Sequence, residues 1–454
     1  MAPVTSTSTD LDAVVDGVVA RADDGEAIEA YAVRSRSTDV RAYDGAVESL
    51  ASSEAMGIGI RVIVEGRQGF AHAGSLDADV IGETLTAARD NARFATPDPE
   101  LVLATPDGVE ASAPSLFDRS LAEATADEKV ALALELERLV RDADPRVSGV
   151  ESADYGDMVA EMALASTTGV SVQSSATRAS LATYVLASQG DETQTGFGFS
   201  VGRGLAELDP SVAARDAGER ATRMLGAVKP ASERTRVVLD PFVTAMFLSI
   251  IGGTFSGESV VRGRSLFADR LGDEVAATDI TLVDDPTDAR AYGAGRFDGE
   301  GLATRRNVLV DHGTLTGFVH NSWSAARMGV ASTGNAVRGG HASMPSVGCR
   351  ALRLEPGTLD RDALYQAVGD GVVVQSVAGL HSGVNPVSGD FSTGAEGVRL
   401  VDGQPAEPLR EFTIGSTLQR MLLDVIAVGS DVEWLPMGAA GVSLAVDGVT
   451  VSGS

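Results

Sequence analysis

The histidines are the first residues to examine for chemistry, because two imidazoles three or four residues apart on a helix can hold a metal ion. The chain of 454 residues contains five of them. They are His72, His312, His320, His341 and His381. No two lie three or four positions apart, so the sequence offers no helical pair of ligands. A site assembled from distant loops stays open as an alternative.

Asp298 and Glu300 form the most suggestive pair of carboxylates. Side chains two positions apart on a strand point the same way. Such a pair can move protons or bind a hard cation. The simpler interpretation, which we favour, is a charged turn whose carboxylates accept hydrogen bonds from a neighbouring loop.

Two glycine-containing segments could line a groove for an extended peptide. Their backbone N–H groups, if exposed, could pair with a peptide strand. Turn formation around glycine explains the same residues equally well, so both interpretations stay open. The candidate groove residues in these segments are Thr333, Gly334, Asn335, Asp390, Phe391 and Ser392, and Asp298 and Glu300 join them as further candidates.

Cys349 is the only cysteine of the chain. It cannot form an intrachain disulfide, which is consistent with a reducing compartment. A nucleophilic thiol needs a nearby base, and neither the sequence nor its spacing supplies one. We therefore expect a buried, unreactive thiol.

The charge of the chain is strongly negative, with 36 basic and 64 acidic side chains and a net charge of −28. This charge repels phosphate backbones and anionic lipids, so we expect neither nucleic acid nor a membrane as a partner. We find no signal peptide and no run of about 20 apolar residues, the length of a membrane span. A cytoplasmic location is the expectation.

Only Lys129 and Lys229 are lysines; the other basic residues are arginines. A surface poor in lysine and rich in carboxylates suits a protein that is kept soluble in high salt, where screening weakens its self-repulsion. We hypothesise that the source is a salt-accumulating microbe, namely a halophilic archaeon.

The elements that must position these residues are organised around one apolar helix. Asp240 can cap its start, and Pro241 fits the first helical position. Apolar side chains between Phe242 and Ile251 fall on every side, which predicts a helix that is buried all round. Gly252 ends it.

The rest of the chain predicts an α+β fold in two lobes. Residues 1–226 read as helices packed on antiparallel sheet, with a β-rich central part at 146–205. Within it, residues 27–35 and 39–43 read as a strand and its partner. Residues 227–235 read as a linker, and residues 236–454 as a β-rich barrel or sandwich around the buried helix.

The apolar helix is followed by a glycine-rich turn and the block Arg262-Gly263-x-Ser265-x-Phe267. This arrangement resembles the TldD/PmbA family of peptidases. The resemblance continues through Asp298-x-Glu300-Gly, a Gly-x-Leu hairpin and Thr333-Gly334-Asn335, in the order and at about the spacing that the family shows. It covers nearly the whole chain.

In the active branch of that family, the helix carries His-Glu-x-x-x-His, which holds zinc and activates water. Counting back from the Arg-Gly block places Leu248, Ser249 and Gly253 at these three positions. The active branch also takes a thiolate from near its C-terminus, where residues 431–441 of this chain contain no cysteine. The resemblance is therefore to the PmbA (TldE) branch, and it implies no metal and no catalytic residue in this chain.

The function that this resemblance implies is that of a metal-free subunit. It would pair with a TldD-like zinc peptidase in a cytosolic complex that degrades or trims unfolded peptides. Two alternatives stay open. The chain could be an active metallopeptidase with unusual ligands, or a stand-alone peptide-binding or regulatory homodimer.

The salt hypothesis gives a first testable prediction. We expect the melting temperature of the purified chain, followed by circular dichroism, to rise steadily from dilute buffer to molar KCl, because screening reduces the repulsion among its 64 acidic side chains. A melting temperature that is as high in dilute buffer as in molar KCl would contradict the halophilic origin.

Overall fold

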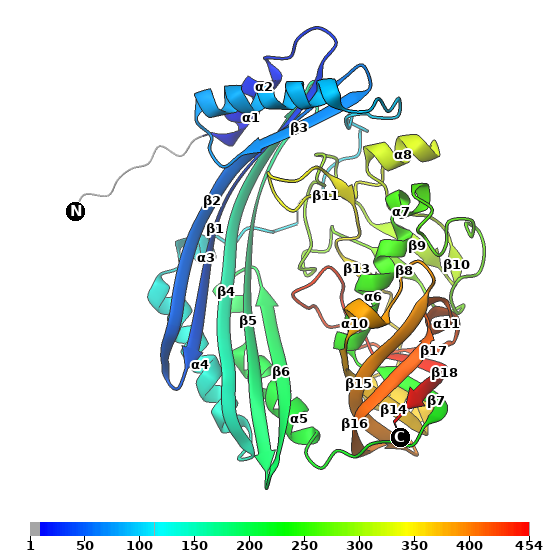
Figure 1. The fold of residues 1–454 in the computed structure, drawn as a ribbon. Helices are drawn as coiled ribbons and strands as arrows, with labels where there is room; N and C mark the ends of the chain where they lie inside the picture. Colours follow the sequence, from blue (N-terminus) through cyan, green and yellow to red (C-terminus); the bar gives the residue numbers. More distant parts are fainter. Residues whose placement is uncertain (1–9, 113, 454) are drawn as a thin grey trace.

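The structure is a computed structural model that describes residues 10–112 and 114–453. It has the predicted α+β class, with a helix-covered sheet in the N-terminal lobe (residues 11–223) and a β-barrel in the C-terminal lobe (residues 233–452). Figure 1 shows the N-terminal sheet curving past one side of the C-terminal lobe. The fold is therefore two β-systems that face each other.

The N-terminal lobe contains one six-stranded sheet in which every neighbouring pair is antiparallel. Its strands, in spatial order, are β3 (Arg67–Ala73), β2 (Ala46–Val64), β1 (Ala27–Tyr43), β4 (Val147–Ser166), β5 (Ser171–Gln189) and β6 (Glu192–Gly202). The prediction of two strands at 27–35 and 39–43 was wrong. Both lie in the single strand β1, which pairs with β2 along its whole length.

Alternating side chains give the two faces of this sheet different roles. On β1, Ile28 and Ala30 belong to a core shared with helices, whereas Tyr31 and Val33 line a cavity against the C-terminal lobe. The helices on the first of these faces and at its edge are α1 (Leu11–Val19), α2 (Ala78–Phe94), α3 (Arg119–Glu123), α4 (Ala126–Ala143), η1 (Leu205–Glu207) and α5 (Pro210–Arg223). The other face is left for the C-terminal lobe.

The C-terminal lobe is built on a closed barrel. Its strands, in order around the barrel, are β16 (Gln404–Thr417), β15 (Asp390–Val401), β14 (Gly371–Ala378), β7 (Glu233–Leu239) and β18 (Leu444–Ser452). The barrel closes because Thr413–Gly415 of β16 pair with Thr450–Ser452 of β18. This closure decides between the barrel and the sandwich that the sequence left open.

Shorter elements connect and cover the barrel. The strands are β8 (Leu282–Asp284), β9 (Asn307–Asp311), β10 (Thr314–Leu315), β11 (Ala336–Val337), β12 (Ser346–Val347), β13 (Leu352–Leu354) and β17 (Val425–Val428). The helices are α6 (Pro241–Gly252), η2 (Gly253–Phe255), α7 (Gly257–Val261), α8 (Ser322–Met328), α9 (Arg361–Val368), α10 (Leu380–Gly383) and α11 (Leu418–Leu423).

Helix α6 starts as the sequence predicts, because the Asp240 carboxylate accepts a hydrogen bond from the Val243 N–H at 3.0 Å. Most of its side chains lie in the core of the lobe. The prediction that it is buried all round was wrong, since Ser249 is exposed and Phe242, Met246 and Ile250 are only partly buried. One stripe of the helix therefore faces solvent.

A buried charge cluster joins the two lobes. The Arg61 guanidinium of β2 lies 2.8 Å from the Glu29 carboxylate of β1 and 3.2 Å from the Glu300 carboxylate of the C-terminal lobe. Arg338 of the C-terminal lobe forms a second ion pair between the lobes, with Glu29. All four side chains are at most 5% exposed. Burial alone would raise the pKa of Glu29, but the two guanidiniums lower it below its usual value.

Two further features concern the predicted boundaries and the membrane. Strand β7 begins at Glu233, inside the segment 227–235 that the sequence marks as a linker; the domain division itself stays a prediction.

Within residues 10–112 and 114–453, no helix has both the length and the apolarity needed to cross a bilayer.

The charge cluster gives a prediction about stability. We expect Glu300→Gln to lower the free energy of unfolding by about 3–5 kcal/mol, because it leaves the buried Arg61 guanidinium with one carboxylate in place of two. Urea denaturation followed by tryptophan fluorescence measures the change. Glu135→Gln on α4 is the matched control, since it breaks an exposed pair with Arg138 and should change little. Equal effects of the two substitutions would contradict a structural role of the cluster.

Candidate functional site between the two lobes

The three positions that the resemblance assigns to the zinc motif, Leu248, Ser249 and Gly253, have no metal-ligating side chain. Leu248 is fully buried in the apolar core of the C-terminal lobe. The Ser249 hydroxyl donates a hydrogen bond to the Ala245 carbonyl oxygen of its own helix at 2.8 Å. Gly253 has no side chain. These residues do not fit a zinc ion, which needs imidazole, thiolate or carboxylate donors.

Cys349 lies beside the end of α6. Its Sγ lies 3.9 Å from the carbonyl oxygen of Gly252. Burial, and then the nearby Asp284 carboxylate, raise the pKa of the thiol well above its usual value. The thiol is therefore protonated at neutral pH and a poor metal ligand. Among the described residues, no group of three or more His, Cys, Asp or Glu side chains is placed to hold a metal ion.

Asp298 and Glu300 lie in the buried turn between β8 and β9. The Asp298 carboxylate accepts hydrogen bonds from the N–H groups of Glu300, Leu302 and Ala336, at 2.9, 2.9 and 3.0 Å. Burial and the neighbouring Glu300 carboxylate raise the pKa of Asp298 to about 7, although the hydrogen bonds from these three N–H groups act to lower it. Glu300 belongs to the charge cluster and also accepts from the Ser322 N–H at 2.8 Å. Both carboxylates thus hold loops together.

Thr333, Gly334 and Asn335 join the same buried region. The Asn335 carboxamide donates to the Asp284 carboxylate at 2.6 Å and accepts from the Asn307 carboxamide at 2.9 Å. The Thr333 hydroxyl donates to the Asn335 side-chain oxygen at 2.8 Å. Gly334 has a φ of +72°, which glycine adopts without strain. The turn is therefore built around its own hydrogen bonds.

Asp390, Phe391 and Ser392 lie elsewhere, at the start of β15 in the barrel. Phe391 points into the core and meets the ring of Phe247 on α6 edge-on, with centroids 6.2 Å apart. Asp390 and Ser392 are exposed. The eight groove candidates therefore form two groups on different elements, and a peptide contact by any of them stays a prediction.

Several cavities lie between the lobes, and two of them combine aromatic with charged side chains. One, of about 340 Å³, separates Tyr31 and Val33 of β1 from the loop at Asp298. The other, of about 390 Å³, lies between α5 and β6 of the N-terminal lobe and the start of α6 in the C-terminal lobe. We call the second one the charged cavity. Its principal polar side chains are Arg220, Asp240, Arg361, Gln375 and Glu433.

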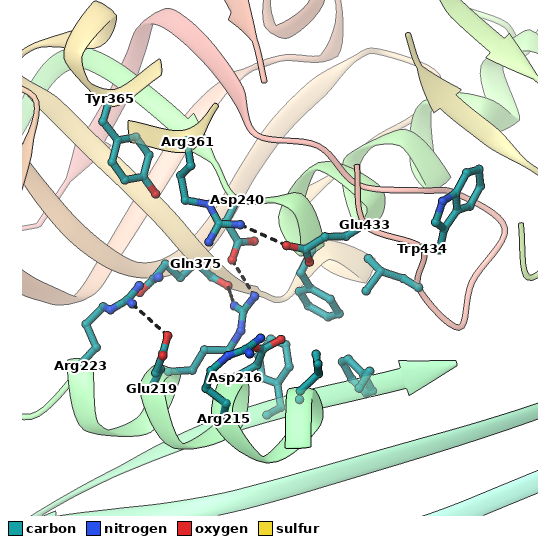
Figure 2. Close-up of a pocket in the computed structure, with 17 residues that line it drawn as sticks. Arg215, Asp216, Glu219, Arg223, Asp240, Arg361, Tyr365, Gln375, Glu433 and Trp434 are labelled. Carbon is teal, nitrogen blue, oxygen red and sulfur yellow. Dashed lines mark hydrogen bonds and ion pairs between the residues drawn. The ribbon is translucent and has the colours of Figure 1, made fainter. Parts of the chain in front are cut away.

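Figure 2 shows how these side chains converge on the charged cavity. Asp240, Arg361 and Glu433 reach it from the C-terminal lobe, and charged side chains of α5 face them. The Arg220 guanidinium of α5 lies 2.8 Å from the Asp240 carboxylate across the two lobes. The Arg361 guanidinium lies 3.1 Å from Glu433 and 3.3 Å from Asp431.

Two of the carboxyl groups have raised pKa values. Burial, and then repulsion by Asp240, raise the pKa of Glu433 to about 7, although Arg361 and Arg220 act against the shift. Burial also raises the pKa of Asp240, despite its ion pair with Arg220. Carboxyl groups with raised pKa values in a cavity are typical of functional sites.

An aromatic wall completes the charged cavity. The rings of Phe197 and Phe199 on β6 approach Phe242 on α6, with centroids 4.6 and 5.9 Å apart. Gly196 and Gly198 alternate with these phenylalanines and face α5 so closely that a Cβ would lie about 2 Å from the backbone of Ala217 or Ala213. The Gly-Phe-Gly-Phe alternation of residues 196–199 is the sequence signal that predicts this wall.

Known proteins match this chain along most of its length. Three family models match, described as PmbA/TldA metallopeptidase domain 1 at residues 28–92, central domain at 119–225 and C-terminal domain at 232–453. A metalloprotease of Methanothermobacter thermautotrophicus is 30% identical over 87% of this chain and 86% of its own length. Metalloprotease PmbA of Escherichia coli O157:H7 is 27% identical over 86% of this chain and 84% of its own length.

Solved structures share the fold. TldE from Thermococcus kodakarensis superposes with a TM-score of 0.86 and 24% identity, over 94% of this chain and 97% of that one. A Thermotoga maritima protein described as a candidate modulator of a DNA gyrase superposes with a TM-score of 0.90 and 22% identity, over 98% and 100%. At these identities the likeness is one of fold.

The close approach of α5 to β6 gives a prediction about the site. We expect Gly198→Ala to lower the free energy of unfolding by about 1–3 kcal/mol, because the new Cβ meets the Ala213 carbonyl oxygen at 2.0 Å and pushes α5 away. Gly149→Ala on β4 is the control, since its Cβ would meet only the Leu186 side chain at 3.7 Å. Thermal unfolding of both variants measures the difference. If Gly198→Ala were as stable as Gly149→Ala, the helix would not be fixed by the glycines.

Proposed function

Because the chain belongs to the PmbA/TldD family of metallopeptidases, we propose that it acts as the metal-free, TldE-like subunit of a peptidase complex. In this proposal, a TldD-like partner supplies zinc and cleaves the peptide bond. This chain would stabilise the partner and bind and position unfolded peptide. The cytoplasm is its proposed location.

One observation carries the proposal. The helix position that must present the first imidazole in an active enzyme is Leu248, whose side chain is fully buried among apolar residues. The position of the catalytic glutamate is Ser249, and that of the second imidazole is Gly253, which has no side chain. Restoring a zinc site would require new donors at each position and an outward rotation of the first one.

The space between the lobes supports the peptide-binding part. Two of its cavities have aromatic and charged side chains in their lining, and in one of them an aromatic wall lies beside ion pairs. The inner face of the N-terminal sheet contributes Tyr31 and Val33 at one cavity and Phe197 and Phe199 at the other. Apolar and aromatic walls with a few polar groups are typical of sites that bind ligands.

Metal analysis of the purified chain tests the non-catalytic part of the proposal. We expect zinc far below one ion per chain by plasma mass spectrometry, and no cleavage of unfolded peptide by the chain alone, because Leu248, Ser249 and Gly253 offer no ligand. Stoichiometric zinc together with cleavage that a chelator abolishes would favour the alternative of an active enzyme with unusual ligands.

Co-purification from the native host tests the partner. We expect a chain with His-Glu-x-x-x-His on a similar helix to accompany the tagged protein, and the pair to cleave peptide in a zinc-dependent manner. A tagged protein that elutes as a homodimer without such a chain would favour the stand-alone binding protein instead.

A further inference from the structure

The cavity between strand β1 and the loop at Asp298 has a wall rich in positive charge. We call it the arginine cavity, and its volume is about 340 Å³. Its charged lining residues are four arginines and two acids, namely Arg178, Arg296, Arg338, Arg350, Glu161 and Asp298. The cations are therefore twice as numerous as the acidic groups in this wall.

Only one of the four guanidiniums has a carboxylate partner in the part of the chain that the structure describes. It is that of Arg338, which pairs with Glu29 in the buried charge cluster. Arg296 and Arg350 each donate a hydrogen bond to a backbone carbonyl oxygen, at 3.3 and 2.8 Å. A carbonyl group carries no net charge, so these cations, like Arg178, have no counter-ion in contact with them.

The Arg178 side chain of β5 lacks a polar partner altogether. Among residues 10–112 and 114–453 it forms neither a hydrogen bond nor an ion pair, and its Nε is buried without an acceptor. The guanidinium lies over the ring of Tyr292, with its central carbon 5.0 Å from the ring centroid. Buried N–H groups nearly always have an acceptor, so a ligand or water is expected at Arg178. This observation is independent of the number of charges.

The two acids in the wall do not neutralise these cations. Asp298 is 1% exposed and already accepts hydrogen bonds from three backbone N–H groups. Its pKa is raised to about 7, mainly by burial, so it is only partly ionised at neutral pH. Glu161 of β4 is exposed, and strand alternation directs its side chain to the helix-covered face of Ala163, away from the cavity. The positive surplus therefore persists.

The guanidiniums around Arg178 repel one another. Burial lowers the pKa of Arg350, and repulsion by Arg178 lowers it further. The same two causes, again with burial the larger, lower the pKa of the neighbouring Arg203 to about 10. An anion bound between Arg178 and Arg350 would relieve this repulsion.

We propose that the arginine cavity binds the carboxylate group of a peptide through Arg178 and Arg350. A carboxylate supplies the negative charge that these cations lack, and its two oxygens can accept paired hydrogen bonds from one guanidinium. The residue that carries the carboxylate packs against Tyr31, Val33 and Met162, the aromatic and aliphatic part of the wall. The inference rests on the proposed peptide-binding role and adds the chemical group by which the peptide is recognised.

Other ligand classes fit the arginine cavity less well. A cation would meet guanidiniums without counter-ions, and no group of three metal ligands is found in the described residues. A small inorganic anion such as phosphate would satisfy the arginines but would leave the apolar side chains of β1 and β4 in water. A peptide carboxylate uses both parts of the wall, whether it comes from the C-terminus or from an acidic side chain.

Isothermal titration calorimetry on the full-length chain tests the proposal. The probes are an N-acetylated hexapeptide acid of leucine, alanine and serine, its C-terminal amide, and the amide with one internal glutamate. We expect a peptide with a carboxylate to bind about tenfold or more tightly than the plain amide, as one charge-assisted hydrogen bond provides. A glutamate peptide as weak as the plain amide assigns the site to the C-terminus, and a glutamate peptide that alone binds tightly assigns it to a side chain.

Inorganic phosphate separates this proposal from a site for free anions. At constant ionic strength, we expect phosphate to bind about tenfold or more weakly than the preferred peptide, because it makes no contact with the apolar part of the wall. Phosphate that binds as tightly as the peptide would contradict the recognition of a peptide carboxylate.

Variants connect the effect to the cavity. Arg178→Gln should weaken the carboxylate peptide about tenfold and leave the amide unchanged, because it removes a cation that has no other polar partner. Arg138→Gln on α4 is the matched control, since it removes the same charge from an exposed ion pair with Glu135 and should change neither affinity. If Arg178→Gln distinguished the peptides as strongly as the unmodified chain does, the arginine cavity would not be the site.

The peptide comparison on the unmodified chain keeps the test decisive even if Arg178→Gln fails to fold. Equal binding of all three peptides would overturn this inference and leave the proposed peptide role intact. Absence of binding by every peptide would overturn both.

Discussion

The spacing of the two lobes depends on the buried cluster of Glu29, Arg61, Glu300 and Arg338. Charges this deeply buried are costly unless each has a partner, and here the partners alternate between the lobes. Moving one lobe away would break both pairs that join the lobes, Arg61–Glu300 and Arg338–Glu29. The cluster therefore fixes the distance across which the charged cavity and its neighbour are held. The Arg220–Asp240 pair repeats the arrangement at the cavity itself.

Helix α6 shows which of its residues the packing of the C-terminal lobe requires. Its cap, its apolar faces and its place against the barrel strands depend on Asp240 and on the core residues around Phe247. None of these requires Ser249 on the exposed stripe or Gly253, the exposed residue that follows the helix. The stripe could therefore change without a loss of packing, whereas the start of the helix contributes Asp240 to the charged cavity.

The sequence predicted those parts of the fold that depend on neighbouring residues. Asp240 and Pro241 mark the start of α6, and alternation marks the strands. The turn at Asp298 accepts backbone hydrogen bonds, as we favoured from its sequence. The fusion of residues 27–43 into one strand was missed, because polar residues between the two halves read as a turn although they pair with β2. The choice between barrel and sandwich needed the pairing of β16 with β18, which joins distant segments.

The charged cavity was beyond such local reasoning. Arg220, Arg361 and Glu433 come from three separate elements, and no spacing in the sequence connects them. The raised pKa of Glu433 exists only because burial and Asp240 act together after folding. By contrast, the Gly-Phe-Gly-Phe run of β6 could have been recognised in the sequence. Glycines that alternate with large side chains on a strand indicate that a helix packs closely on the glycine face.

The closure of the barrel also sets an order on biosynthesis. Strand β7 has both β14 and β18 as neighbours, and the seam is sealed by β18 against β16. The ribosome makes β7 long before it makes β18. One edge of β7 therefore stays unpaired while about two hundred residues are synthesised. The N-terminal sheet has all six strands by Gly202 and meets no such delay. The nascent C-terminal lobe is thus the part of the chain that we expect to bind chaperones during translation.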